Sequence, residues 1–353
     1  MNGVWYLTPS DPSIRLKQET EIQINALMDH ILAAQRPDGA IAWWPGHKID
    51  PWDHVEAAMG LSVGGAYQQA RQAFTWLQGQ QLPDGSWFAA YGNGTASDQT
   101  RETHHAAYIA VGLYHYYLVT RDLDFIHRMW PAVERAVAFA LRWQTDEGDI
   151  FWALDPHGRV DQMALLTGCS SIHFALGCAG RLAELIQQPR PCWQEARKRL
   201  RACIIDKPHR FNMTKARFAM DWFYPVLGGV LRHEAARKRI VGQWKKFVIE
   251  NMGVRCVSDQ PWVTIAETCE LILALNAMGD EHNTLGRILF NWINTRTFED
   301  DTFWCGFTVP DMAIWPGEKI TWTNAVVLLA ADALFGITPG ADLFRHIHWM
   351  VND

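Results

Sequence analysis

Apolar residues recur at three- and four-residue spacing along this 353-residue chain, and this helical periodicity constrains the fold more than any other feature. Alternating runs bounded by hairpin turns, which would predict strands, are weak. The expected helices span residues 18–34, 54–68, 70–80, 104–119, 129–144, 165–186, 193–204, 219–232, 236–249, 263–278, 282–296 and 321–337. The pattern therefore predicts an all-α chain.

These expected helices alternate in character along the chain. The odd-numbered ones, such as residues 129–144 and 236–249, carry one charged face and are typical of helices half in water. The even-numbered ones, such as 104–119 and 263–278, are rich in alanine, glycine and apolar residues, which favours burial on most sides. Short connections lead from even to odd helices, and long ones lead from odd to even helices. This alternation predicts an (α/α)6 toroid, a single domain over residues 1–353 with its six long loops on one face.

A short turn motif recurs after several of the outer helices. The segment QRPDGAIAWW at Gln35–Trp44 is echoed by QLPDGSWFAA at Gln81–Ala90, and more loosely by Thr145–Ala153 and Phe298–Gly306. In each case acidic and small turn residues are followed by an aromatic side chain. An Asp-Gly pair supplies the tight turn, so the sequence indicates an internal repeat of the kind found in helical arrays.

At these residues the chain resembles the alpha/alpha-toroid proteins. Arg121–Asp155 and DPWDHVEAAMGL at Asp50–Leu61 resemble the six-hairpin glycosidases of the glucoamylase and trehalase type. AFTWLQGQQLPDGSW at Ala73–Trp87 resembles the QW repeat of terpene cyclases and prenyltransferase-type toroids, with Gln81 and Gly85 in register. The resemblance implies the toroid fold, while fold alone does not give the reaction.

Two reactions are therefore open. The first is glycoside hydrolysis by an Asp/Glu acid–base pair, and the alternative is a terpene cyclase or prenyltransferase-like enzyme acting on a prenyl lipid. The class II cyclase motif Asp-x-Asp-Asp is absent, and the nearest cluster, Glu299–Asp301, has a different pattern. A third possibility is a toroid that binds a glycan or lipid without turnover.

The long loops carry an unusual number of tryptophans. The chain has 18 of them, several times the usual share. Many lie beside Gly, Pro and Asp outside the helical runs, where a large indole is costly to expose. Together with neighbouring carboxylates they favour a sugar, since aromatic faces pack on pyranose C–H surfaces while carboxylates bind hydroxyls.

Hydrolysis of a glycoside requires two carboxyl groups. The resemblance to six-hairpin glycosidases implies an acid from the loop between the fifth and sixth helices, Asp161 or Asp155, and a base from the loop before the twelfth, Glu318 or Asp311. We select Asp161 and Glu318, each just ahead of an inner helix. The expected substrate-binding residues are Trp44, Trp52, Asp53, Glu56, Trp87, Glu102, His105, Trp152, Trp262, Glu267, Trp304, Trp315 and Lys319.

Each of these carboxylates has a simpler interpretation as a helix cap or dipole partner. Glu267 and Glu270 are harder to explain in that way, because they lie on an apolar inner helix and a buried carboxylate must be paired or functional. If Asp161 and Glu318 prove dispensable, Asp53, Glu56 and Glu267 are the next candidates.

Composition excludes several other classes. A net charge of −6 argues against a nucleic-acid partner. The longest strongly apolar stretch, Val326–Ile337, is about 12 residues, too short to span a bilayer. Seven cysteines without a CxxC pair indicate reduced thiols, and the first 19 residues lack a signal-peptide pattern. We expect a cytoplasmic protein with no metal or other cofactor, since the adjacent His104 and His105 should point to different sides of a helix.

Overall fold

The computed structural model describes residues 13–92 and 94–346, with side chains from residue 24 onward. Twelve α-helices dominate this part of the chain, which confirms the prediction of a mostly helical protein. They are α1 (Ser13–Ala34), α2 (Pro51–Val63), α3 (Tyr67–Gln80), α4 (Thr103–Thr120), α5 (Leu123–Arg142), α6 (Leu166–Leu185), α7 (Pro191–Asp206), α8 (Ala219–Leu227), α9 (His233–Phe247), α10 (Ile265–Met278), α11 (Asn283–Ile293) and α12 (Thr321–Phe335).

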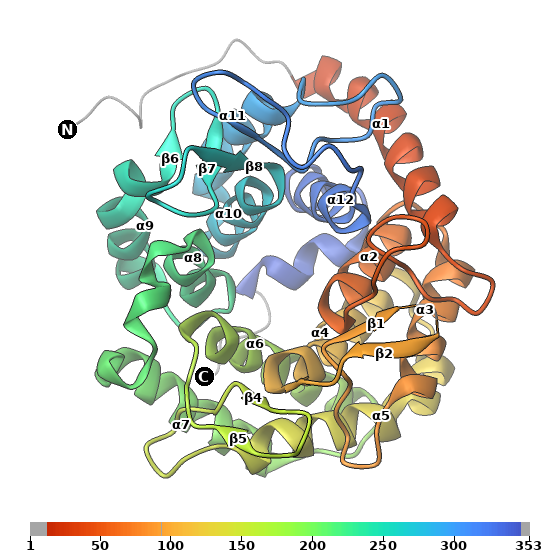
Figure 1. Cartoon of the computed structure of the whole chain (residues 1–353), viewed down its shortest axis with the longest axis vertical. Coiled ribbons are helices and arrows are strands. Elements are labelled where there is room, and N and C mark those ends of the chain that lie inside the picture. Colours follow the sequence, from red (N-terminus) through yellow and green to blue (C-terminus); the bar gives the residue numbers. More distant parts are fainter. Residues whose placement is uncertain (1–12, 93, 347–353) are drawn as a thin grey trace.

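The even-numbered helices pack on one another in a closed circuit. In chain order α2 contacts α4, α4 contacts α6, and so on through α8 and α10 to α12, which returns to α2. Most even-numbered helices also pack against an odd-numbered neighbour on the outside, as Figure 1 shows. The inner helices are buried along nearly their whole length, because alanine, glycine and apolar residues occupy every face; all 14 residues of α10 are buried.

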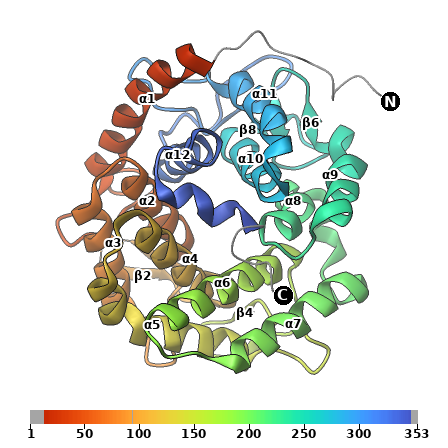
Figure 2. The ribbon, with the colours of Figure 1, turned by 180° about the vertical axis from the view of Figure 1, so that it is seen from behind.

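The far side of this circuit is covered by the last described segment. A 3-10 helix, η4 (Pro339–Phe344), contacts α4, α10 and α12 and is visible in dark blue across the centre of Figure 2. Further 3-10 turns are η1 (Pro208–Arg210), η2 (Met213–Arg217) and η3 (Asp280–His282). No helix among the described residues is both long and apolar enough to cross a membrane. The first 12 residues, part of the segment inspected for a signal peptide, lie outside the described residues.

The long loops contain short strands that the sequence analysis did not predict. They are β1 (Ala90–Gly92), β2 (Thr95–Asp98), β3 (Arg101–Glu102), β4 (Ala153–Leu154), β5 (Val160–Asp161), β6 (Val248–Ile249), β7 (Gly253–Arg255), β8 (Trp262–Thr264) and β9 (Gly306–Thr308). They pair antiparallel as β1-β2, β3-β4-β5 and β6-β7-β8-β9. Strands of two to four residues are too short to show an alternating pattern.

The recurring turn motif is a clamp between neighbouring outer helices. The Gln81 side-chain amide donates to the carbonyl of Gly85 at 3.0 Å and to that of Ala132 in α5 at 2.9 Å. Gln35 and Gln144 repeat this arrangement, donating to the glycine four residues on and to Gln69 of α3 or Ala196 of α7. The motif therefore holds each turn against the next outer helix.

Gly85 is the position of this clamp that tolerates least change. Its φ is +95°, and an added Cβ would lie 2.1 Å from the Arg135 carbonyl oxygen. We expect Gly85→Ala to lower the free energy of unfolding by about 3 kcal/mol, because both backbone strain and a backbone clash oppose it. Gly65→Ala is the matched control, since Gly65 has φ +88° with nothing within 4 Å of an added Cβ. Urea unfolding should show a loss of about 1 kcal/mol for that control; equal losses would contradict the clamp.

Candidate active site

The N-terminus of α2 carries three acidic side chains one turn apart. Asp50 caps the helix, its Oδ1 accepting from the Asp53 amide at 2.9 Å and its Oδ2 from the Trp43 indole at 2.8 Å. Asp53 is partly exposed. Burial raises its pKa well above the usual range, and the negative charges of Asp50 and Glu56 add to the shift. Burial and the neighbouring charges therefore favour the protonated form of the Asp53 carboxyl, which is the form that a general acid needs.

Glu56 lies one turn deeper and is 3% exposed. Its Oε1 accepts from the Tyr108 hydroxyl of α4 at 2.7 Å, and its Oε2 accepts from the Trp322 indole of α12. Burial raises the pKa of Glu56 to about 7, although these hydrogen bonds oppose the shift. With both oxygens bonded, this carboxyl ties α2 to its two neighbours.

The raised pKa of Glu56 makes the stability of the protein depend on pH. The folded state favours the protonated form, so the stabilising contribution is full below pH 4.5 and is lost as the pH rises toward 7. Between these values we expect the wild type to lose on the order of 3 kcal/mol relative to Glu56→Gln, which cannot titrate. Unfolding measured for both proteins from pH 4 to pH 8 tests this. A difference in stability between the two proteins that does not change from pH 4 to pH 8 would contradict it. A constant offset from altered hydrogen bonding, added to the expected pH-dependent loss, would not.

Two further carboxylates lie on α10, one turn apart. Glu267 is in the first turn and is 6% exposed, whereas Glu270 is 1% exposed. Burial raises the pKa of Glu270 well above its usual range, and the charges of Glu56 and Glu267 reinforce this. The nearby Tyr224 hydroxyl of α8 opposes the shift. Glu267 is thus the member of this pair nearer the helix N-terminus, where the inner helices meet the long loops.

The charges of acidic groups on α2 and α10 act on one buried side chain, the thiol of Cys305. It lies in the loop after α11 and is 7% exposed. Burial raises its pKa to about 12, and the negative charges of Glu267, Asp53 and Glu318 all contribute. The charges of three carboxylates, from α2, α10 and the loop before α12, therefore act on one buried group, so these carboxylates lie in the same part of the structure, as two-carboxylate chemistry requires.

Aromatic rings cover the inner part of this region. The Trp52 indole stacks on Tyr108 with ring centroids 3.9 Å apart, and Tyr224 lies 5.8 Å away. On its other side Trp52 meets the imidazoles of His104 and His105, at 5.7 Å and 6.3 Å. The rings provide apolar faces beside the carboxylates, as a sugar-binding site requires.

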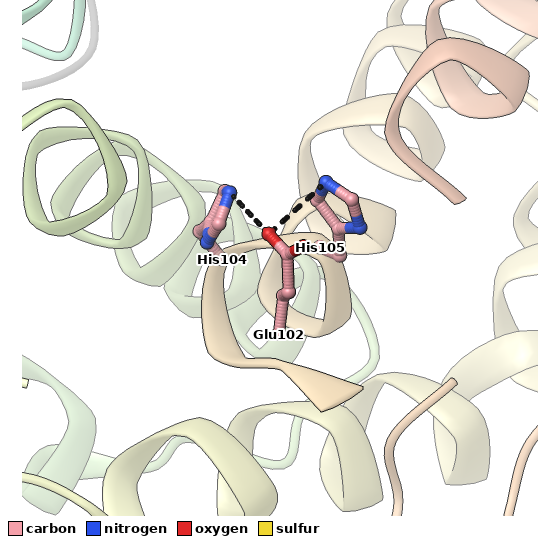
Figure 3. Close-up of side chains that lie close together, drawn as sticks. All are labelled: Glu102, His104 and His105. Atoms are coloured by element: carbon pink, nitrogen blue, oxygen red, sulfur yellow. Dashed lines mark ion pairs between the residues drawn. The ribbon is translucent and has the colours of Figure 1, made fainter. Parts of the chain in front are cut away.

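Figure 3 shows that Glu102, His104 and His105 point toward one another. The Glu102 Oε2 lies 3.1 Å from the Nε2 of His104 and 3.6 Å from that of His105. Burial raises the pKa of Glu102, lowers that of His104 to about 4 and lowers that of His105. The expectation that the two histidines diverge is wrong, because they start α4 directly after strand β3 and both reach back to Glu102.

The two carboxylates selected from loop position lie near the surface. Asp161 is exposed on the hairpin strand β5, opposite Ala153, and Glu318 is exposed in the loop before α12. Asp161 is therefore not in the buried surroundings that are typical of a general acid. The negative charge of Glu318 does act on the Cys305 thiol and on the His47 imidazole. Asp53 and Glu267, named as binding residues, lie deeper than either.

The expected tryptophans lie in different surroundings. Trp44 stacks on His47 at 3.6 Å, and Trp52 belongs to the inner aromatic cluster. Trp262 and Trp315 pack edge to face at 4.9 Å, with Trp315 58% exposed. Trp152 and Trp304 are half-buried.

Trp87 and Lys319 have structural partners. Trp87 is 1% exposed and donates to the Leu77 carbonyl in α3, so it belongs to the hydrophobic core and not to the loop face; the spacing of the motif did not separate these two positions. Lys319 pairs with Asp300 and lies over the Phe298 ring.

Sequence reasoning missed Tyr108, Tyr224 and Trp322 as partners of the acidic groups. Their side chains donate to Glu56 or lie beside Glu270 from three different inner helices. The available signal was a polar hydroxyl or indole within an otherwise apolar helix, which has to find a partner when buried.

A curated protein from Mycolicibacterium hassiacum, "MMP endo-(1,4)-3-O-methyl-alpha-D-mannosidase", is 44% identical over 339 residues, covering 96% of this chain and 92% of that protein. No family model matches the chain. Among solved structures, one titled "Glycosidase Wild Type" has a TM-score of 0.69 at 16% identity, covering 92% of this chain and 99% of that one. A D-mannose isomerase has a TM-score of 0.67 at 10% identity, covering 92% and 98%. These structures share the fold.

Proposed function

This chain belongs to the family of the MMP endo-(1,4)-3-O-methyl-alpha-D-mannosidase, and we propose from that membership that it cleaves internal (1,4) linkages between 3-O-methyl-α-D-mannose units. The protein is a glycoside hydrolase, as predicted, and its substrate is a sugar. The terpene cyclase alternative is not favoured, and the buried carboxylates at the N-terminal turns of α2 and α10 also count against an apolar prenyl chain.

The architecture proposed for this activity is an (α/α)6 toroid in one domain. The closed circuit of contacts among the even-numbered helices supports it. A single hydrophobic core cluster, whose buried members extend in the sequence from Leu27 to Phe344, supports it as well. In such a ring the N-terminal turns of the inner helices converge on one face, which is where Asp53 and Glu267 lie.

The acid and base proposed here are Asp53 and Glu267. Burial and the neighbouring Asp50 and Glu56 raise the pKa of Asp53 and so favour its protonated form, which can donate the proton to the departing glycosidic oxygen. Glu267, whose charge acts on the same Cys305 thiol as that of Asp53, is the carboxylate that activates water or attacks the anomeric carbon. Glu318 stays a candidate at the outer edge of the same region. The observation that carries this proposal is that the charges of Asp53 and Glu267, on two different inner helices, both act on the buried Cys305 thiol.

Trp52 is proposed to contact the sugar ring whose bond is cleaved, and the fully buried Tyr108 and Tyr224 are proposed to hold the Trp52 indole in place. A methyl ether at O3 enlarges the apolar surface of mannose, which suits stacked aromatic faces. The rim tryptophans Trp44 and Trp315 are proposed to bind neighbouring units of the chain. We also propose a cytoplasmic location without a nucleic-acid partner, supported by seven free thiols and the acidic net charge.

Product analysis tests the proposed function. The full chain is incubated with a long α-(1,4)-linked 3-O-methylmannose oligosaccharide, and the products are sized by mass spectrometry at early times. Internal cleavage predicts fragments of intermediate length before any monomer. An unmethylated α-(1,4)-mannose oligosaccharide of equal length is the control and should react more slowly. Release of monomer alone, or no hydrolysis, would contradict the proposal.

A further inference from the structure

The cluster of Glu102, His104 and His105 is placed by two rigid elements. Glu102 ends strand β3, which pairs with β4, and the two histidines lie in the first turn of α4. Between them, Thr103 donates its backbone N–H to the Trp152 carbonyl at 2.9 Å and its hydroxyl to the Phe151 carbonyl at 2.9 Å. The junction of strand and helix is therefore fixed from both sides, which favours a preorganised site.

The three side chains present donor atoms with the spacing of metal ligands. One carboxylate oxygen and one nitrogen from each imidazole all lie within 4.8 Å of one another, and two of the separations are 3.1 Å and 3.6 Å. Ligand bonds of about 2.0–2.2 Å place neighbouring donors about 3–3.5 Å apart around a metal ion. In Figure 3 a carboxylate oxygen of Glu102 lies between the two imidazoles.

The surroundings supply negative charge and leave the imidazoles without a competing donor or acceptor. Asp50 and Asp98 both add to the negative potential at Glu102, and Lys48 is the cationic side chain that opposes them. Among the described residues no Lys or Arg forms an ion pair with Glu102. Among the described residues the Nδ1 atoms of both histidines are buried without a hydrogen-bond partner, so the polar contacts of the two rings are those of their Nε2 atoms with Glu102.

We propose that Glu102, His104 and His105 form a binding site for one divalent first-row transition metal ion. Two imidazoles and one carboxylate on one side of the ion leave coordination positions open on the other. The Trp52 ring packs against both imidazoles and holds their orientation. This site goes beyond the proposed hydrolysis, which Asp53 and Glu267 perform without a metal.

Metal binding by the full chain tests the proposal without reference to activity. Chelator-treated protein is titrated with ZnCl₂ by calorimetry, and we expect one equivalent per chain. Glu102→Gln, His104→Ala and His105→Ala should each weaken the affinity at least about 100-fold, because loss of a ligand costs more than loss of an outer-shell partner. His209→Ala, at an exposed histidine, is the matched control and should bind as the wild type does.

A second readout separates ligation from folding. The wild type loaded with Co²⁺ should gain visible absorption bands from imidazole coordination, and Zn²⁺ should raise its melting temperature through linkage. Glu102→Gln keeps the shape of the side chain, so its unfolding without metal should match the wild type. Zinc binding that survives all three substitutions, or no binding by the wild type, would overturn the proposal. Since hydrolysis is measured separately, failure of this site leaves the proposed function standing.

Discussion

Replacing Asp53 by asparagine should reduce turnover about 10³-fold while leaving the fold intact. The substitution keeps the size of the side chain and removes the proton that the glycosidic oxygen must receive, and general acid catalysis contributes about 10²–10⁴-fold. The folded protein should be no less stable, because the carboxyl is already held in its neutral form by burial and by Asp50 and Glu56. Initial rates on the oligosaccharide and thermal unfolding of both proteins measure the two effects.

Asp161→Asn is the control for this experiment. Asp161 is exposed on β5, so its loss should change the rate less than twofold. The position implied by resemblance and the position favoured by the structure are thereby compared directly. If Asp161→Asn were inactive while Asp53→Asn stayed active, the acid would be Asp161 and not Asp53.

Replacing Glu267 by glutamine should also reduce turnover about 10³-fold or more, because the amide can neither activate water nor attack the anomeric carbon. Glu270, one turn further along α10, provides a matched control. Burial and the nearby negative charges of Glu56 and Glu267 raise its pKa well above the usual range, which favours the protonated form, and Glu270→Gln mimics that form in size and charge. We expect this variant to retain at least a tenth of the activity.

The two α10 variants also separate chemistry from binding. If Glu267 acts only in the chemical step, Glu267→Gln should lower kcat with little change in KM. A rise in KM at constant kcat would make Glu267 a binding residue. Loss of activity in Glu270→Gln with normal rates in Glu267→Gln would exchange their roles and contradict the proposed pair.

The helices could be predicted from the sequence because their signal is local. Charged faces on the outer helices and alanine-rich inner helices alternate in the chain, and the packing of α2, α4 and their successors follows this alternation. The Gln-x-x-x-Gly turn was visible as a repeat at Gln35 and Gln81, although its role as a clamp required the partner carbonyls in the next helix. Strands β3 to β5 could not be predicted, since such short segments are defined only by their pairing.

The site was predicted less well, because its members meet only in three dimensions. Asp161 and Asp53 both lie just before or at the start of an inner helix in the sequence, and nothing local shows that one is exposed and the other faces the acidic region. The same holds for His104 and His105. Adjacent residues of a regular helix diverge, whereas at the junction of β3 and α4 both approach Glu102.

The most direct test of the central claim is a crystal structure of Asp53→Asn with an intact 3-O-methylmannose oligosaccharide. The proposed mechanism predicts the scissile oxygen within about 3 Å of the residue 53 side chain, a normal hydrogen-bond distance. It also places the Glu267 carboxylate beside the anomeric carbon and the Trp52 region against the sugar. An oligosaccharide bound with neither residue 53 nor Glu267 near a glycosidic bond, for example along the exposed β5 hairpin, would contradict the account.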